Sequence, residues 1–242
     1  MQHLSDGATS PSAAVRPASL SLVDALRTTG AVRKFTDQAV NDAVLARILD
    51  TARFAPSGAN AQAWRVVVVK DAANRRRLRD CYLRGSRDYV ALSAAGLRPW
   101  APTNDRQAKA RALAAGSAGA IGDFAEKFDE VPALLALFAD LSMLAAVDRD
   151  ADRYTFAGGA SIYPFAWTVL LAARDEGLGG VITTIAIREE DEVKAILGAP
   201  DHMALAAVIA LGYPVRAPRG LRRQPVSSFA SVDSIDGPAF RV

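Results

Sequence analysis

Apolar residues recur at helical spacing in the first part of the chain, and polar residues mark where each helix begins. Ser21, with Asp24 three positions later, resembles a capping box that opens a first helix. Asn41 can cap a second helix, whose apolar positions include Val44 and Ile48. We expect this second helix to end before the Pro-Ser-Gly break at 56–58.

Four short apolar runs later in the chain indicate strands. The first, 64–69, is a β-branched run too short for a lone helix, and it predicts a strand buried on both faces. The other runs cover 132–138, 180–184 and 204–211, and helical patterns at 165–176 and 189–197 separate them. The pattern predicts a layered domain of the α/β type.

Three further segments complete the expected organisation. Residues 78–130, rich in Ala and Arg with aromatic residues at irregular intervals, predict a helical excursion or lid. Residues 1–18 predict a flexible N-terminal arm, and we expect one domain over 19–242. Its basic, Pro-rich end at about 214–242 predicts an arm that wraps a partner subunit.

Composition narrows the class of protein. Half of the 242 residues are apolar, which is enough for one substantial core. The formal charge of +3 is small and the arginines are scattered, so we expect no nucleic-acid partner. No segment reaches the roughly 18 apolar residues of a membrane span, and a single cysteine, Cys81, suits a reducing cytoplasm.

The rare residues argue against several chemistries. His3 and His202 are the only histidines, which excludes a histidine metal cluster and a Ser-His-Asp relay. We interpret His202 as a solvated turn residue, with a solvent-facing proton donor as the alternative. Gly116, Gly119 and Gly122 do not match a dinucleotide fingerprint, and we expect them to be small residues at a helix contact.

Two loops could carry a ligand. Residues 54–64 place a hydroxyl, two side-chain amides and a free glycine backbone between a helix and a strand, which suits a planar heterocycle. An Asx-type turn that satisfies its own backbone is the competing interpretation. Residues 177–180 join a helix to a strand through three glycines, which either cap the helix or let another backbone or ligand approach closely.

A third set of residues is basic. Arg27, Arg33 and Lys34 follow the first helix, and Arg222 and Arg223 lie far downstream. Together these side chains could clamp a phosphate. The alternative is that most of them are ordinary surface residues.

In their order along the chain, these segments resemble the nitroreductase family. The resemblance covers about residues 21–226. It is carried by Arg-Lys-Phe at 33–35, Ala-Pro-Ser-Gly-Ala-Asn-Ala-Gln-Ala-Trp at 55–64, Gly-Ala-Ser-Ile at 159–162, Leu-Leu-Ala-Ala-Arg at 170–174, Gly-Leu-Gly at 177–179 and Leu-Gly-Ala-Pro at 197–200. Several motifs in one order are far more specific than any one of them.

The resemblance implies an α+β fold: a three-layer sandwich with a central, mainly antiparallel sheet flanked by helices, in an intertwined homodimer. It also implies two FMN sites at the subunit interface, each built from both chains. The residues that it assigns to the phosphate of FMN are Thr29, Gly30, Ala31 and Arg33, with Arg223, or its neighbour Arg222, as the second cationic arm. It assigns Pro56, Ser57, Gly58 and Asn60 to the ring from the partner's side, and Val181, Ile182, Thr183 and Thr184 along the ring. It assigns no catalytic side chain and no metal.

The implied activity is electron-pair transfer from NAD(P)H to a nitroaromatic, quinone or enone by a ping-pong mechanism. Two departures from the family pattern keep other functions open: Thr29-Gly30 replaces a basic pair, and Trp167-Thr168 replaces a frequent Gln and Asn. The alternatives are an FMN-storage protein with little turnover, and a specialised enzyme that acts on a dedicated metabolite and draws on oxygen. The lid would carry that specialisation.

Overall fold

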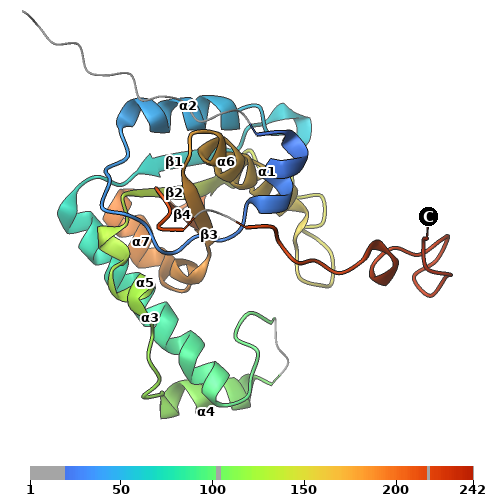
Figure 1. Ribbon diagram of the computed structural model, residues 1–242. Helices are drawn as coiled ribbons and strands as arrows, with labels where there is room; N and C mark the ends of the chain where they lie inside the picture. Colours follow the sequence, from blue (N-terminus) through green and yellow to red (C-terminus); the bar gives the residue numbers. More distant parts are fainter. Residues whose placement is uncertain (1–19, 102–104, 217–218, 242) are drawn as a thin grey trace, which may run out of the picture.

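A four-stranded antiparallel sheet organises the residues that the structure describes, which are 20–101, 105–216 and 219–241 of a computed structural model (Figure 1). Its strands are β1 (Trp64–Val68), β2 (Ala133–Asp140), β3 (Gly179–Thr183) and β4 (Met203–Gly212). They lie in the order β1-β2-β4-β3, and all three pairings are antiparallel. The mainly antiparallel sheet implied by the resemblance is confirmed. The arm predicted over 1–18 falls outside the described residues.

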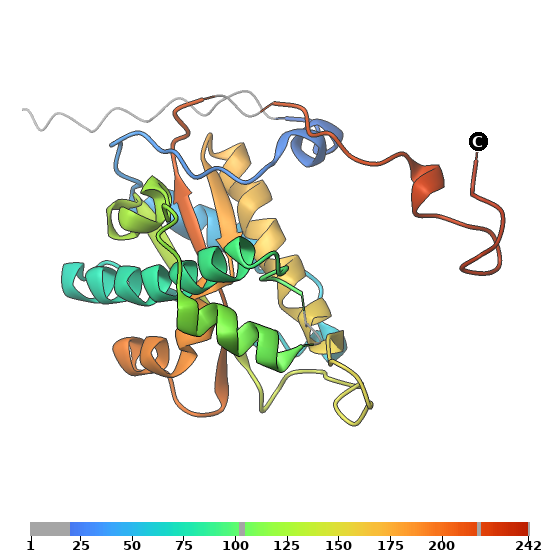
Figure 2. The same ribbon diagram turned by 90° about the horizontal axis from the view of Figure 1, so that it is seen from below.

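Helices cover both faces of this sheet (Figures 1 and 2). The α-helices are α1 (Leu22–Thr28), α2 (Asp42–Ala52), α3 (Ala72–Ala94), α4 (Arg106–Ala115), α5 (Asp123–Glu126), α6 (Tyr163–Asp175) and α7 (Glu190–Leu197). The short 3-10 turns are η1 (Gly58–Asn60), η2 (Phe128–Glu130), η3 (Ala157–Ser161), η4 (Ile185–Glu189) and η5 (Val226–Ser228). Helices α2 and α6 pack on one face, and α3 and α7 on the other. This is the predicted three-layer arrangement.

Strand β2 shows why both layers form. Its side chains point alternately to the two faces of the sheet, and every one of its residues is buried. Leu135 and Leu137 join the apolar cluster of α2 and α6, whereas Leu134 and Phe138 join the cluster of α3 and α7. A continuous apolar run is therefore required here, because neither face meets water.

Strand β1 differs from the prediction. It lies at an edge of the sheet, its Arg65 side chain is exposed, and Val66 and Val67 are only half-buried. The prediction that this strand is buried on both faces is wrong, because within one chain no element covers it as fully as the central strands β2 and β4. Its β-branched residues reflect strand propensity rather than complete burial.

The predicted helix starts are confirmed by their capping bonds. The Ser21 hydroxyl accepts a hydrogen bond from the Asp24 amide (3.1 Å) and donates one to the Asp24 carboxylate (2.7 Å). The Asn41 side-chain oxygen accepts a hydrogen bond from the Ala43 amide (2.8 Å). Each cap satisfies amides that the first turn of a helix leaves without partners.

The stretch predicted as a lid over 78–130 contains α3, α4 and α5, and α3 starts earlier than expected. The cap is Asp71, whose carboxylate accepts a hydrogen bond from the Asn74 amide (2.8 Å). The first half of α3 belongs to the core through Leu78 and Cys81, and its second half runs out with α4 beside it (Figure 1). The helical character is as predicted, but only the outer part of the stretch lies beyond the core.

The three glycines of the lid have different roles. Gly116 ends α4 and Gly122 begins α5, both with positive φ (64° and 94°). Only Gly119 matches the predicted close helix contact, because a Cβ placed there would lie 2.7 Å from Val90 of α3. The helix-contact interpretation is therefore wrong for Gly116 and Gly122, which instead permit left-handed turns.

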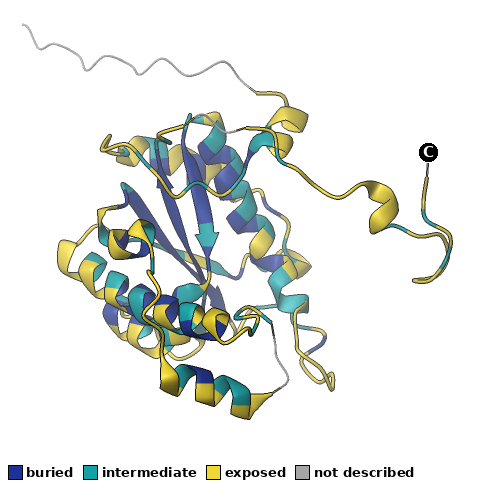
Figure 3. Ribbon diagram, turned by 60° about the horizontal axis from the view of Figure 1, so that its bottom comes forward, coloured by how far each residue is buried: buried dark blue, intermediate teal, exposed yellow. Residues whose placement is uncertain are grey.

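Beyond Leu221, whose amide donates a hydrogen bond to the Arg27 carbonyl, the C-terminal segment leaves the body of the molecule (Figures 1 and 3). It contains η5 and a small turn in which Ser231 pairs with Ala239. Large apolar side chains are exposed along it, including Phe229 and Ile235, the latter 93% exposed. Such a row of apolar groups in water is unfavourable for an isolated chain.

Candidate functional site

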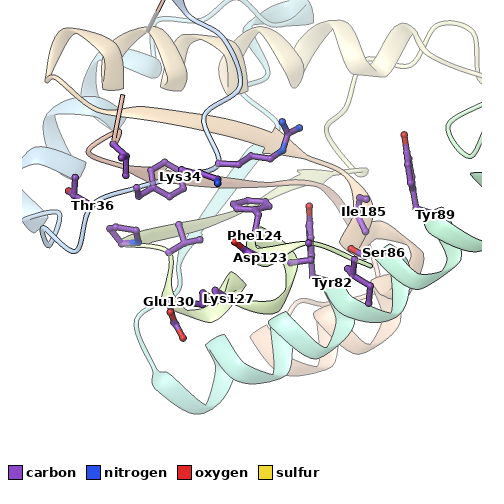
Figure 4. Close-up of a pocket in the computed structure, with 18 of the residues that line it drawn as sticks. Lys34, Thr36, Tyr82, Ser86, Tyr89, Asp123, Phe124, Lys127, Glu130 and Ile185 are labelled. Carbon is purple, nitrogen blue, oxygen red and sulfur yellow. The ribbon is translucent and has the colours of Figure 1, made fainter. Parts of the chain in front are cut away.

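A cavity of about 820 Å³ opens between the segment after α1, one face of α3, and the stretch around α5 (Figure 4). This volume lies within the roughly 300–1,000 Å³ typical of small-molecule sites. Its lining combines basic, aromatic and hydroxyl side chains, among them Arg33, Lys34, Tyr82, Ser86, Tyr89, Phe124, Lys127 and Ile185. Three carboxylates, Asp37, Asp123 and Glu130, also line the cavity and equal the three basic side chains in number. The aromatic walls suit a planar ligand.

Glycines let two backbones meet just before Arg33, which lines the cavity. The Val32 amide donates a hydrogen bond to the Gly180 carbonyl (2.8 Å), and Ala31 pairs with Gly180. A Cβ on Gly180 would lie 2.5 Å from the Ala210 carbonyl oxygen, and a Cβ on Gly179 would lie 2.7 Å from Val32. Both interpretations of 177–180 hold, because Gly177, with φ of 80°, ends α6 while the next two glycines allow the close approach.

Two segments that hold predicted phosphate residues contact each other although they lie far apart in the sequence. A Cβ on Gly30 would lie 2.8 Å from Leu221, and the Leu221 amide donates a hydrogen bond to the Arg27 carbonyl (2.9 Å). This contact brings Arg222 and Arg223 next to the end of α1. Both arginines are exposed, as a group that must meet a ligand would be.

Thr29 lies at the same place and carries an unsatisfied group. Its side chain is only 7% exposed, and its hydroxyl has no hydrogen-bond partner in the described part of the chain. A buried polar atom without a partner costs about 1–3 kcal/mol, so such an atom in a folded protein calls for an explanation. The hydroxyl oxygen is shielded from solvent in the single chain, and Thr29 is not among the residues that line the cavity, so a ligand oxygen would reach it only after a local movement.

The end of β3 reaches the cavity through a side-chain hydrogen bond. The Thr183 hydroxyl donates to the Tyr82 hydroxyl (3.1 Å), and both side chains are buried. Burial raises the pKa of Tyr82 above its ordinary value, whereas the bond from Thr183 and the charge of Arg33 act in the opposite direction. Of the other residues predicted along the ring, Val181 is buried, Ile182 is half-buried and Thr184 is exposed.

The loop predicted to meet the ring, with Pro56, Ser57, Gly58 and Asn60, has an unusual backbone. Ala59, Asn60 and Gln62 all have positive φ (53°, 53° and 49°), although none of them is glycine. Part of the loop satisfies itself, since the Ser57 hydroxyl accepts a hydrogen bond from the Gln62 amide (3.0 Å). Left-handed residues other than glycine cluster at functional sites, and nothing in the sequence indicated this conformation.

This loop lies apart from the cavity within one chain. It packs instead against Ala145 and Ser161, and the Gly58 amide donates a hydrogen bond to the Ser161 hydroxyl (2.9 Å). No hydrogen bond in the described ranges joins the loop to a residue that lines the cavity. Of the residues assigned to FMN, Arg33 alone is among those that line the cavity, and Thr183 reaches it through Tyr82. The segment 27–32 contacts Gly180 and Leu221, whereas the loop 56–60 joins neither group.

Sequence reasoning missed two groups at the site and one that supports it. Tyr82 and Ser86 line the cavity, and their spacing with Tyr89 places all three on one face of α3. The spacing was a usable signal, but it was hidden in a stretch without clear apolar periodicity. Ser161 was visible only as part of the Gly-Ala-Ser-Ile segment.

The second departure from the family pattern is Trp167-Thr168, and both side chains make contacts within the body of this chain. Trp167 packs against the apolar cluster of α2 and α6, and the Thr168 hydroxyl donates to the Pro164 carbonyl of its own helix (2.8 Å). Neither side chain is among those that line the cavity. The replacement therefore has no direct contact with this part of the site.

Two other kinds of feature are absent from the residues described. No group of three metal-ligating side chains is found there, and no described helix is long and apolar enough to cross a membrane. His202 is an exposed turn residue, as predicted.

A family model described as the nitroreductase family matches residues 26–213. A relative from Thermus thermophilus named NADH dehydrogenase is 32% identical over 183 residues, 76% of this chain and 82% of the relative. A second relative, 5,6-dimethylbenzimidazole synthase from Rhodospirillum rubrum, is 29% identical over 189 residues, 76% of this chain and 77% of the relative.

Solved structures give the same fold. Oxidized iodotyrosine deiodinase bound to FMN and 3-iodo-L-tyrosine aligns with a TM-score of 0.59 and 23% identity, over 85% of this chain and 96% of that one. At this identity the likeness concerns the fold alone.

Proposed function

This chain belongs to the nitroreductase family, and from that premise we propose that it is an FMN-dependent oxidoreductase. The proposed reaction transfers electron pairs from NADH or NADPH to a small organic acceptor of the nitroaromatic, quinone or enone type. The NADH dehydrogenase relative supports a nicotinamide donor, and the FMN in the deiodinase structure supports the cofactor.

One observation carries the proposal: the buried Thr29 hydroxyl, which has no partner among the described residues, adjoins Gly30, and Gly30 packs against Leu221 next to Arg222 and Arg223. Gly30 and Ala31 adjoin it, Arg33 lines the cavity, and the Leu221 contact brings Arg222 and Arg223 to the same end of α1. A phosphate needs such a set of donors and cations. These residues therefore fit the phosphate of FMN, although Thr29-Gly30 replaces a basic pair.

In this reaction the protein positions the flavin ring and keeps water away from it. Bound FMN would supply the hydride chemistry. Residues 181–184 would run along the ring, and the apolar lining, with Phe124 and Ile185, would keep water from it. The chain carries no dinucleotide fingerprint, which supports a nicotinamide that binds as a visiting substrate and leaves before the acceptor enters.

We also propose that the active form is a homodimer. The loop 56–60 lies outside the cavity of its own chain, so a second copy is needed to bring the same loop to the ring. The exposed apolar side chains of 219–241 supply a surface that a second copy would cover. A cytoplasmic location suits the single cysteine, Cys81.

The test is an absorption spectrum of the purified protein before and after anaerobic NADH or NADPH. A bound flavin band that bleaches supports the reductase and identifies its donor. A band that persists with both donors indicates storage of FMN, or a different donor as in a specialised enzyme. Absence of a flavin band after addition of FMN would contradict the proposal. Double-reciprocal plots of the steady-state rates, at several fixed concentrations of the acceptor, should give parallel lines. Converging lines would contradict the ping-pong order.

A further inference from the structure

Helix α3 presents hydroxyl groups to the cavity from one of its faces. Tyr82, Ser86 and Tyr89 follow one another at helical spacing, and Figure 4 shows their side chains rising from α3 toward the cavity. Tyr82 is 5% exposed, whereas Tyr89 is exposed and stacks on Trp100 with ring centroids 6.0 Å apart. Of the two tyrosines, only Tyr82 has its hydroxyl in a buried setting.

The Tyr82 ring is held on several sides. It stacks on Phe128 with centroids 4.2 Å apart, and the Phe124 ring lies perpendicular to it with centroids 5.9 Å apart. One turn on, Gly85 lies so close to η4 that a Cβ there would be 2.7 Å from the Ile185 carbonyl oxygen. The position of the Tyr82 hydroxyl is therefore fixed by packing before any ligand binds.

The hydrogen bond between Tyr82 and Thr183 uses only one of the two hydroxyl protons of this pair. Each hydroxyl can donate one hydrogen bond, and a single bond joins the two groups, so the pair keeps one O–H free whichever oxygen accepts. With Thr183 as donor, the free proton is that of Tyr82, which lines the cavity. Because burial raises the pKa of Tyr82, the phenol stays protonated and neutral near pH 7.

We infer that the Tyr82 hydroxyl, held by Thr183, donates a hydrogen bond to the reducible ring that binds in this cavity. This inference rests on the proposed function and adds a binding residue to those that the family resemblance assigns. A fixed donor in a site shielded from water stabilises negative charge that develops on its partner. Reduction adds electrons to the ring, so the donor should favour the reduced form over the oxidised form.

The test measures the reduction potential of bound FMN in Tyr82→Phe, which keeps the ring stack and removes the hydroxyl. We expect the binding of reduced FMN to weaken about tenfold more than the binding of oxidised FMN. For a two-electron couple this corresponds to a potential about 30 mV lower. Tyr154→Phe is the matched control, since it makes the same change at an exposed tyrosine that does not line the cavity, and it should leave the potential unchanged.

Thr183→Val provides a second variant should Tyr82→Phe fold poorly. It should lower the potential in the same direction, and the double variant should show no larger shift than Tyr82→Phe alone, because Thr183 acts through Tyr82. An unchanged potential in both single variants would overturn the inference while the proposed function stands. A wild-type protein that binds no FMN would instead refute the proposed function, before any variant is compared.

Discussion

The buried Ser161 hydroxyl accepts a hydrogen bond of 2.9 Å from the Gly58 amide, although the two residues lie 103 positions apart. This bond ties the loop 57–62, which contains the three left-handed residues, to the end of η3, just before α6. The loop has little room there, since a Cβ on Gly58 would lie 2.6 Å from that of Ala145. The conformation of the loop is therefore fixed by contacts with Ser161 and Ala145 as well as by the hydrogen bond of Ser57 within the loop.

Replacing Ser161 with Ala should destabilise the protein and weaken its flavin site together. The Gly58 amide would lose its partner, at a cost of about 1–3 kcal/mol in the free energy of unfolding. If loop 56–60 of a second copy holds the ring, the Kd for FMN should also rise. Urea unfolding at one protein concentration and a flavin titration measure the two effects.

The matched control for this change is Thr168→Val. The Thr168 hydroxyl also bonds to a backbone group, but within its own helix α6, and it does not contact the loop. This variant should leave the Kd for FMN at the wild-type value. A Ser161→Ala protein that is less stable yet binds FMN normally would show that the loop does not take part in binding.

Replacing Thr29 with Val should change stability and ligand binding in opposite directions. Val keeps the shape of Thr and removes a buried hydroxyl without a partner, so the FMN-free protein should become more stable by about 1 kcal/mol. The same change removes a donor from the proposed phosphate site, and the Kd for FMN should rise roughly tenfold. Thermal unfolding without FMN and a fluorescence titration give the two values.

Thr28→Val is the neighbouring control for that experiment. The Thr28 hydroxyl donates to the Asp24 carbonyl of its own helix (2.7 Å), so its loss should not raise the stability. The Kd for FMN should stay unchanged. Equal effects of the two substitutions on FMN binding would remove Thr29 from the phosphate site.

The sequence predicted those features of the structure that depend on residues close together along the chain. The caps at Ser21 and Asn41 and the run in β2 were predictable, because each follows from a few neighbouring residues. The left-handed Ala59 and the unpartnered Thr29 hydroxyl were not, because contacts with residues far along the chain create them. Placing the phosphate residues depended on the family resemblance, since no local pattern links Thr29 with Arg223.

The pH dependence of stability should reveal Asp148, which organises the loop between β2 and α6. Its carboxylate accepts hydrogen bonds from the Phe156 amide (2.9 Å) and from the Arg153 guanidinium (2.8 Å). The Phe156 bond and then the Arg153 bond lower its pKa from 3.8 to about 2. Because the folded-state pKa is depressed, this stabilisation is complete above about pH 4. It is lost as the pH falls toward 2.

Asp148→Asn measures this contribution directly. The wild type should be more stable than the variant at pH 7, and the gap between them should narrow as the pH falls from 4 toward 2. Urea unfolding of both proteins at pH 7, 4 and 3 gives the comparison. A gap that stays constant over this range would mean that the charge of Asp148 contributes nothing to folding.

The C-terminal segment should contribute separately to dimerisation and to FMN binding. Deleting 224–242 removes the exposed Phe229 and Ile235 but keeps Arg222 and Arg223. If a second copy covers these apolar side chains, the deletion should produce a monomer in analytical ultracentrifugation. Because the ring loop then has no second copy to reach, FMN binding should be lost as well.

The double variant Arg222→Ala with Arg223→Ala should weaken FMN binding through the phosphate alone and remain a dimer. A monomeric deletion protein that retains all of its FMN would contradict a site built from two chains.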